Sequence, residues 1–271
     1  MKQSSEPSLR APIVAIMIIQ VAALFARAFL ETRLIESGEP MTFAQDLSYL
    51  VVPPILIVLM NPILRQHGRF LRSLLQRRDL TIRLIVMSML LGITLRMTYW
   101  GGLISFVSFG VLRNSDPNAV VGPVFFFGCP DSNVLALSFI VLSFLIPVTE
   151  EIINRGLILQ SLLYRGKILA VALSSVLFAV MHDPKAIMLT FIVGLFLAVQ
   201  TINHKTLWAP LITHATYNGV AVLDLECVSG QWNPIETSPS MIGTGLIAPA
   251  LTMAGISISI FLVRQRRLRG V

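Results

Sequence analysis

Two adjacent carboxylates lie in a mostly apolar part of the chain, shortly after a proline. On a helix, Glu151 and Arg155 are four residues apart, so they share one face and can neutralise each other. Glu150 points about 100° away from Glu151 and shares its face with Asn154 instead. Pro147 has no N–H to give to the helix and frees a carbonyl, which predicts a kink beside a water-filled cavity. Glu150, which has no local cation, is therefore suited to act as a general base.

Three further polar side chains lie in the apolar stretches that follow. His182 ends one stretch, whereas His214 and Asn218 lie four residues apart on one helical face of another. Burying two hydrogen-bonding side chains on one face costs free energy unless they find partners, and few partners exist at membrane depth. The alternatives to a catalytic site are an interhelical structural network, an interfacial position for His182, and a solvated helix end for the two glutamates.

Two histidines and a glutamate could also bind zinc, as in hydrolytic His₂Glu sites. The motif His-Glu-x-x-His does not occur in the chain, and neither does Gly-x-Ser-x-Gly. Neither cysteine lies beside a histidine, which argues against a Cys-His nucleophile. Zinc is therefore the less favoured alternative, and no cofactor is expected.

The elements that must position these residues are transmembrane helices, each of which needs roughly 20 mostly apolar residues. The chain is 55% hydrophobic and 13% charged, whereas soluble domains carry about 25% charged residues. We therefore expect an all-α, polytopic membrane protein of about eight transmembrane helices, forming one domain over residues 1–271. The apolar stretches are 11–30, 47–64, 81–110, 133–152, 167–182, 185–203, 206–223 and 242–263.

The basic residues alternate with these stretches. Most of the 21 lysines and arginines precede the first stretch, separate the second from the third and the sixth from the seventh, or follow the fourth and the eighth. The positive-inside rule then places both termini in the cytoplasm, for a protein of the cytoplasmic (inner) membrane. Arg155 is counted here as a loop residue on the cytoplasmic side, and Asp46 as a residue of the opposite side. The net charge of +7 is explained by such loops and does not indicate binding to nucleic acid.

Two features of this topology stay open. Ala26-Arg27-Ala28 loosely resembles a signal-peptide cleavage site, but the long apolar run and the seven further stretches favour an uncleaved first helix. Cys129 and Cys227 both fall in expected outer loops, where they could form a disulfide or remain free.

Three segments together resemble the CPBP family, which comprises CAAX prenyl proteases and bacteriocin-processing enzymes and is also called Abi. Glu150-Glu151-x-x-x-Arg155-Gly156 resembles its first motif, the stretch from Ser174 to His182 its second, Phe-x-x-x-His, and the stretch from Leu207 to Asn218 its third, His-x-x-x-Asn. The resemblance covers about residues 140–225, and three motifs in the right order are more specific than any one of them.

The resemblance implies an intramembrane endopeptidase of the glutamic type, with about eight helices and a metal-free mechanism. Carried over, Glu150 is the general base, His182 assists it, and His214 and Asn218 stabilise the oxyanion. Glu151 and Arg155 become an orienting pair in support. The implied partners are the lipid bilayer and a membrane-associated protein or peptide, with a C-terminal sorting tail or a peptide leader preferred to a CAAX-type substrate.

Two departures and one conflict accompany the resemblance. Asn154 stands where an aromatic residue is common, and Asp183 stands where an apolar residue is usual, so substrate preference could differ. With helix ends expected at 152 and 182, Glu150 would lie near the cytoplasmic end of its helix and His182 near the outer end. These two residues can meet only if the helices tilt or one is broken within the membrane.

Two other classes of function compete with proteolysis. A non-catalytic immunity or scaffold protein would be expected to lack one of the motif residues, yet all are present. A proton-coupled transporter would use Glu, His and Arg in its spans, but it is typically built from two similar halves, and no such repeat is visible.

Overall fold

The computed structural model describes residues 10–113, 132–182, 187–222, 254–256 and 258–260. Within these residues the chain forms helices and no strands, which confirms the all-α prediction. Five helices of the described part are long and apolar enough to cross a membrane. Cys129, Cys227, Asp183 and most of the expected eighth stretch, 242–263, lie outside the described residues, and the number of eight spans stays a prediction.

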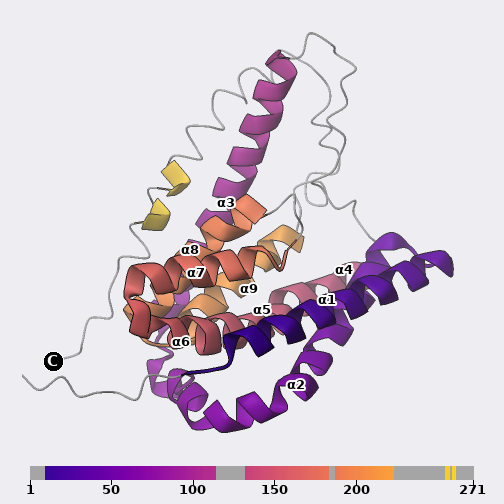
Figure 1. Cartoon of the computed structure of the whole chain (residues 1–271). Helices are drawn as coiled ribbons and strands as arrows, with labels where there is room; N and C mark the ends of the chain where they lie inside the picture. Colours follow the sequence, from indigo (N-terminus) through magenta and orange to yellow (C-terminus); the bar gives the residue numbers. More distant parts are fainter. Residues whose placement is uncertain (1–9, 114–131, 183–186, 223–253, 257, 261–271) are drawn as a thin grey trace, which may run out of the picture.

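Five helices of the described part pack against a central helix or against one another. They are α1 (Ile13–Glu36), α2 (Met41–Leu74), α3 (Ile82–Arg113), α7 (Lys167–Ala179) and α8 (Ile187–His204). The helix α9 (Trp208–Val222) carries His214 and packs along α3, whereas α1 pairs with α2 and α7 pairs with α8. In Figure 1, α7, α8 and α9 gather around the middle of the molecule, and the α1–α2 pair extends to one side. The helix α1 runs without a break through Ala26-Arg27-Ala28.

The central helix runs from Ser132 to Arg165 as a series of connected segments. These are α4 (Ser132–Ile140), a π-helical turn η2 (Val141–Leu145), α5 (Ile146–Glu151), a π-helical stretch η3 (Ile152–Leu159), α6 (Gln160–Leu162) and η4 (Leu163–Arg165). The expected helix end at residue 152 is therefore wrong. The residues after Glu151 are again largely apolar, and the charge of Arg155 is buried and paired, so nothing there ends the helix.

The carbonyl freed by Pro147 finds a side-chain partner. In η2 the N–H of Ile146 bonds to the carbonyl of Val141, five residues back. In the same register the carbonyl of Leu142 would need the N–H of residue 147, which proline lacks. The Asn218 amide nitrogen of α9 donates to this carbonyl over 2.8 Å. A π-helical turn and a side chain thus satisfy the backbone where a kink beside a water-filled cavity was expected, and they join the central helix to α9.

Close backbone approaches fix the position of α9. A Cβ added at Gly92 of α3 would lie only 2.5 Å from the backbone oxygen of Thr213, so glycine permits this contact. The Thr213 hydroxyl donates to the carbonyl of Ser88 over 3.1 Å. Because Thr213 directly precedes His214, α3 determines where the His214 side chain enters the bundle.

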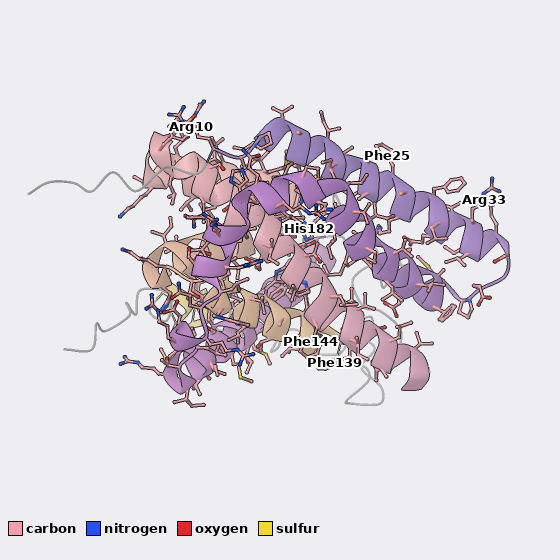
Figure 2. The ribbon with its side chains drawn as sticks, turned by 90° about the horizontal axis from the view of Figure 1, so that it is seen from below. Arg10, Phe25, Arg33, Phe139, Phe144 and His182 are labelled. Carbon is pink, nitrogen blue, oxygen red and sulfur yellow. The ribbon has the colours of Figure 1, made fainter. Side chains whose placement is uncertain are left out.

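The basic links that we expect on the cytoplasmic side contact one another at two places. The carbonyl of Leu74, at the end of α2, accepts hydrogen bonds from the N–H of Leu207 and the hydroxyl of Thr206 in the α8–α9 link. The backbone N–H of Ala11 donates to Ser161 over 2.8 Å at the other junction. Arg10 lies at this end of α1 and Arg33 at its opposite end (Figure 2). These contacts agree with the expected grouping of the basic links.

Two charges assigned to loops lie inside helices instead. Arg155 is fully buried within η3, where it faces Glu151. Asp46 is buried within α2, where its carboxylate accepts a hydrogen bond from the hydroxyl of Ser138 on α4. Both residues have partners on the bundle interior, which makes their burial tolerable. Neither charge can therefore be used to assign a loop to one side of the membrane.

Candidate active site

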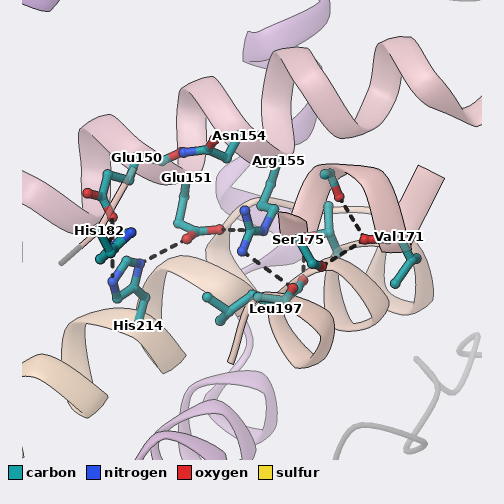
Figure 3. A network of polar contacts seen from close by, with 12 residues as sticks. Glu150, Glu151, Asn154, Arg155, Val171, Ser175, His182, Leu197 and His214 are labelled. Carbon is teal, nitrogen blue, oxygen red and sulfur yellow. Dashed lines mark hydrogen bonds and ion pairs between the residues drawn. The ribbon is translucent and has the colours of Figure 1, made fainter. Parts of the chain in front are cut away.

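Four of the predicted site residues converge at the centre of the bundle. Glu150 and Glu151 end α5, His182 lies just after α7, and His214 lies in the middle of α9. The Glu150 Oε2 atom lies 3.9 Å from Nε2 of His182 and 3.8 Å from Nε2 of His214. Figure 3 shows the two imidazoles on one side of the central helix, facing the two carboxylates. The residues that the motifs single out thus form one cluster.

The conflict between the depths of Glu150 and His182 disappears with the corrected helix length. The central helix continues for fourteen residues beyond Glu151, to Arg165, so Glu150 lies near its middle. The helix α7 is short, with 13 residues, and ends at Ala179. His182 therefore lies in the turn after a short helix, at the level of Glu150.

The second carboxylate forms a buried chain of contacts. Glu151 Oε1 lies 2.9 Å from Nδ1 of His214, and its Oε2 lies 3.5 Å from Nε of Arg155. The side chains of Glu151 and Arg155 are both 0% exposed. Arg155 also donates to the carbonyl of Gly194 on α8 and places its guanidinium over the ring of Phe178, 4.4 Å from the ring centroid. For Glu151 the interpretation as a solvated helix end is therefore wrong.

Glu150 differs from its neighbour in its exposure and in the residues that it contacts. Its side chain is 24% exposed, and its Oε2 atom has no hydrogen-bond partner among the described residues. Separations of 3.8 and 3.9 Å from the two imidazoles exceed a direct hydrogen bond and suit groups that share a water molecule. Asn154 shares the face of Glu150, as the spacing predicted, but its amide donates to the Glu150 backbone carbonyl and leaves the carboxylate unengaged.

The hydrogen-bond partners fix the same tautomer for both histidines. Nδ1 of His182 lies 2.9 Å from the carbonyl of Phe178, and a carbonyl only accepts, so this nitrogen carries the hydrogen. Nδ1 of His214 likewise donates to the Glu151 carboxylate. In the neutral form, both Nε2 atoms therefore turn a lone pair toward Glu150. A protonated His214 would become a hydrogen-bond donor at Nε2, and the Glu151 carboxylate would stabilise its positive charge.

The fifth predicted residue, Asn218, lies one turn beyond His214 and contacts the central helix. Its amide nitrogen donates to Leu142, so one of its two N–H groups has a partner within the fold. This contact could not be predicted from the spacing of residues, because it depends on the π-helical turn η2. Asn218 therefore links the two helices that carry Glu150 and His214.

Two contributors to the site were given no role from the sequence. The ring of Phe178 packs against His182 at 4.6 Å and against His214 at 5.8 Å between ring centroids, and it also lies under Arg155. Its spacing of four residues from His182 was the available signal. Nothing in the sequence pointed to the carbonyl of Gly194, because every residue has a backbone carbonyl and the residue type does not show which one accepts a side-chain hydrogen bond.

The described residues contain no group of three or more His, Cys, Asp or Glu side chains arranged to hold a metal ion. Zinc binds nitrogen ligands at about 2.0–2.1 Å in compact tetrahedral sets. The two imidazoles and Glu150 are the nearest approach to such a set, with separations of 3.8 and 3.9 Å between their facing atoms.

The fold and the site define a class of protein, which is a helical integral membrane protein with a buried Glu-His cluster suited to hydrolysis. Residues 132–220 match a family model described as type II CAAX prenyl endopeptidase Rce1-like. This segment, which holds all the predicted site residues, is therefore similar to the CPBP family of membrane proteases, and the match confirms the resemblance that its three motifs indicated. No curated protein and no solved structure gives a significant match to the chain.

Proposed function

We propose that this protein is a glutamic-type intramembrane endopeptidase that hydrolyses a peptide bond of a membrane-associated protein or peptide. The observation that carries the proposal is the unequal pair of carboxylates. Glu151 is fully buried between Arg155 and His214, whereas Glu150 is 24% exposed, has no arginine beside it, and turns its Oε2 atom toward two imidazoles. A C-terminal sorting tail or a peptide leader is our preferred substrate class, ahead of a prenylated CAAX protein.

In the proposed mechanism, a water molecule binds between Glu150 Oε2 and Nε2 of His182. Glu150 takes a proton as the water oxygen attacks the peptide carbonyl carbon, and the carbonyl π electrons move to its oxygen. A protonated His214 and the remaining amide N–H of Asn218 donate to this oxyanion, and each such donor is typically worth about 2.7–4 kcal/mol. When the intermediate collapses, the oxyanion electrons restore the carbonyl, the carbon–nitrogen bond breaks, and the amine leaves with the proton that Glu150 has held. The carboxylic acid that remains then gives its proton to the amine, so the products are a carboxylate and an ammonium group.

The proposal includes a location. We place the protein in the cytoplasmic (inner) membrane as one domain over residues 1–271, with both termini in the cytoplasm. The paired basic links at the ends of α2 and of α6 support a common side for these segments. The oligomeric state has no bearing on the mechanism, since all the proposed groups come from one chain.

Zinc remains the alternative to a metal-free reaction. We expect the purified protein to keep its activity after exhaustive treatment with a chelator. Arg155 already neutralises Glu151, His214 contacts the same carboxylate, and the remaining groups are too far apart to hold a metal tightly. The measurement is peptide turnover together with the zinc content of the sample. Loss of turnover that added zinc restores would contradict the metal-free mechanism.

Proteolysis itself is best tested by comparing peptide termini in the native host. One strain would carry the wild-type protein and the other Glu150→Gln at equal abundance, since glutamine keeps the size of the side chain but cannot accept the proton of water. We expect specific new termini to be present in the first strain and absent from the second, and these termini identify the substrates. An identical set of termini at matched expression would favour an immunity or scaffold protein, or a transporter, for which proton-coupled flux in vesicles would be measured next.

A further inference from the structure

Exposed cations gather where the central helix ends, away from the Glu-His cluster. Arg165 ends η4, Gly166 turns the chain with a φ of +105°, and Lys167 begins α7. Arg10 stands just before α1, next to the point where the backbone bonds to the central helix. The side chains of Arg10, Arg165 and Lys167 are all exposed. Three cations from two distant parts of the sequence therefore share one corner of the surface.

The ring of Tyr164 brings the two arginines together. The guanidinium carbon of Arg10 lies 5.7 Å from the ring centroid, and that of Arg165 lies 5.3 Å from it. Nε of Arg165 donates to the Tyr164 hydroxyl over 2.6 Å, which leaves the hydroxyl hydrogen as a further donor. Tyr164 is itself exposed. Arg10, Tyr164 and Arg165, called the Tyr164 cluster below, thus present two guanidinium groups and a phenol to the outside.

The described residues supply no anion for this cluster. None of their carboxylates forms an ion pair with Arg10, Arg165 or Lys167. Arg33, at the opposite end of α1 (Figure 2), also stacks on an aromatic ring, but it pairs with Glu36 at 3.2 Å. Bringing like charges together costs free energy. An anion bound between the two arginines would offset that cost.

General rules account for the presence of these cations but not for their arrangement. The positive-inside rule predicts Lys and Arg at this end of the bundle, without any contact between them. A basic side chain at a helix end commonly donates to the last free carbonyls. Arg165 donates to a phenol instead. Neither rule therefore explains why two arginines share one tyrosine ring.

The surface that adjoins the cluster is apolar. The helix α7 follows Arg165 directly and exposes Ile168, Leu169, Leu173 and Val176 along its length. A tyrosine and cations beside an apolar face are typical of the membrane–water interface, where the headgroups of lipids lie. A phosphate bound at the cluster would therefore have room for its acyl chains along α7.

We propose that the Tyr164 cluster binds the phosphate of an anionic phospholipid, from the leaflet that meets this end of the bundle. Guanidinium N–H groups and the Tyr164 hydroxyl donate to the phosphate oxygens in charge-assisted hydrogen bonds, for which arginine is well suited. Lys167 adds positive charge, and the acyl chains pack on the exposed face of α7. A zwitterionic lipid fits less well, because its own cation would approach the arginines. This site does not depend on the proposed protease function.

The test uses the purified full-length protein, exchanged into detergent until native lipid is removed. Phosphatidylglycerol, phosphatidylcholine and inorganic phosphate are titrated separately, and the unfolding temperature is measured. A ligand that binds only the folded protein raises this temperature with its concentration. We expect a saturable rise with phosphatidylglycerol and none with the other two. No rise with phosphatidylglycerol, or an equal rise with phosphatidylcholine or inorganic phosphate, would overturn the inference.

Variants of the cluster locate the site. Arg10→Gln and Arg165→Gln should each weaken phosphatidylglycerol binding about fivefold, as for the loss of one cation near an anionic headgroup. Tyr164→Phe keeps the ring and removes the phenol donor, so it should weaken binding about tenfold. Without lipid, all three should unfold close to the temperature of the wild type, since these side chains are exposed.

Two control variants separate this site from a diffuse attraction to charge. Arg33→Gln removes a ring-stacked arginine at the other end of α1, and Arg78→Gln removes an exposed cation of η1 among the basic links. Both should bind the lipid as the wild type does. If Arg78→Gln weakened binding as much as Arg165→Gln and Tyr164→Phe had no effect, the attraction would be diffuse and the inference wrong. Stabilisation by a polyglutamate peptide but not by the lipid would assign the surface to an acidic protein segment instead.

Discussion

Glu150→Gln is expected to remove peptide cleavage while leaving the fold intact. Loss of a general base lowers kcat by about 10²–10⁴-fold. Stability should hardly change, because the Glu150 Oε2 atom has no hydrogen-bond partner to lose and Asn154 bonds to the backbone carbonyl of this residue, which the substitution keeps. The measurements are turnover of a quenched fluorescent peptide that spans a bond cleaved in the host comparison, and the thermal unfolding temperature, both on the purified full-length protein in one detergent.

The control for this prediction is Glu36→Gln, the same exchange at an exposed carboxylate near the end of α1. Glu36 pairs with Arg33 at 3.2 Å in a well-exposed position, where such pairs contribute little to stability. This variant should keep both its turnover and its unfolding temperature. If Glu150→Gln retained wild-type turnover, the general base would have to be another residue. If it unfolded, the side chain would have a structural role that its unpaired oxygen does not suggest.

The contrast between Glu150 and Glu151 follows from their environments. Helical geometry alone separates the two side chains by about 100°, which suffices to predict that only Glu151 can pair with Arg155. The structure adds that Glu151 lies fully inside the bundle and contacts His214, whereas Glu150 stays partly exposed. Adjacent carboxylates thus divide into a structural group that orients a histidine and a group available for chemistry.

The sequence predicted the parts of the site that depend on spacing along one helix. The pairing of Glu151 with Arg155, the shared face of Glu150 and Asn154, and the isolation of His214 in an apolar stretch all belong to this kind. The features of the site that could not be predicted from the sequence depend on contacts between helices. The helix was expected to end at 152 because charged residues usually lie at membrane interfaces. The Gly194 carbonyl and the Phe178 ring, in addition to Glu151, explain why Arg155 is tolerated inside.

The π-helical turns are a second feature that the sequence did not reveal. Pro147 indicated a freed carbonyl, but not which carbonyl or which partner. Because η2 has π-helical hydrogen bonds, the carbonyl that lacks a backbone partner is that of Leu142, and this carbonyl faces Asn218 on α9.

Arg155→Met is expected to destabilise the fold strongly, in contrast to Glu150→Gln. Methionine has a similar length and no charge, so it leaves Glu151 as a fully buried carboxylate without its cation. Breaking a buried ion pair by removing one partner typically costs about 3–5 kcal/mol. The measurement is the free energy of unfolding in mixed micelles, or the unfolding temperature where unfolding is irreversible. Cleavage should fall in parallel, because His214 loses a fixed partner as the core loosens.

The double variant Glu151→Gln with Arg155→Met separates the two causes. It removes both charges, so most of the lost stability should return, since replacing both members of a buried pair is often near neutral. Cleavage should not return with it, because glutamine is neutral and cannot stabilise a protonated His214 as a carboxylate does. A double variant as unstable as Arg155→Met would show that Arg155 acts through Gly194 and Phe178 and not through Glu151. A stable double variant with full turnover would show that cleavage does not require a protonated His214.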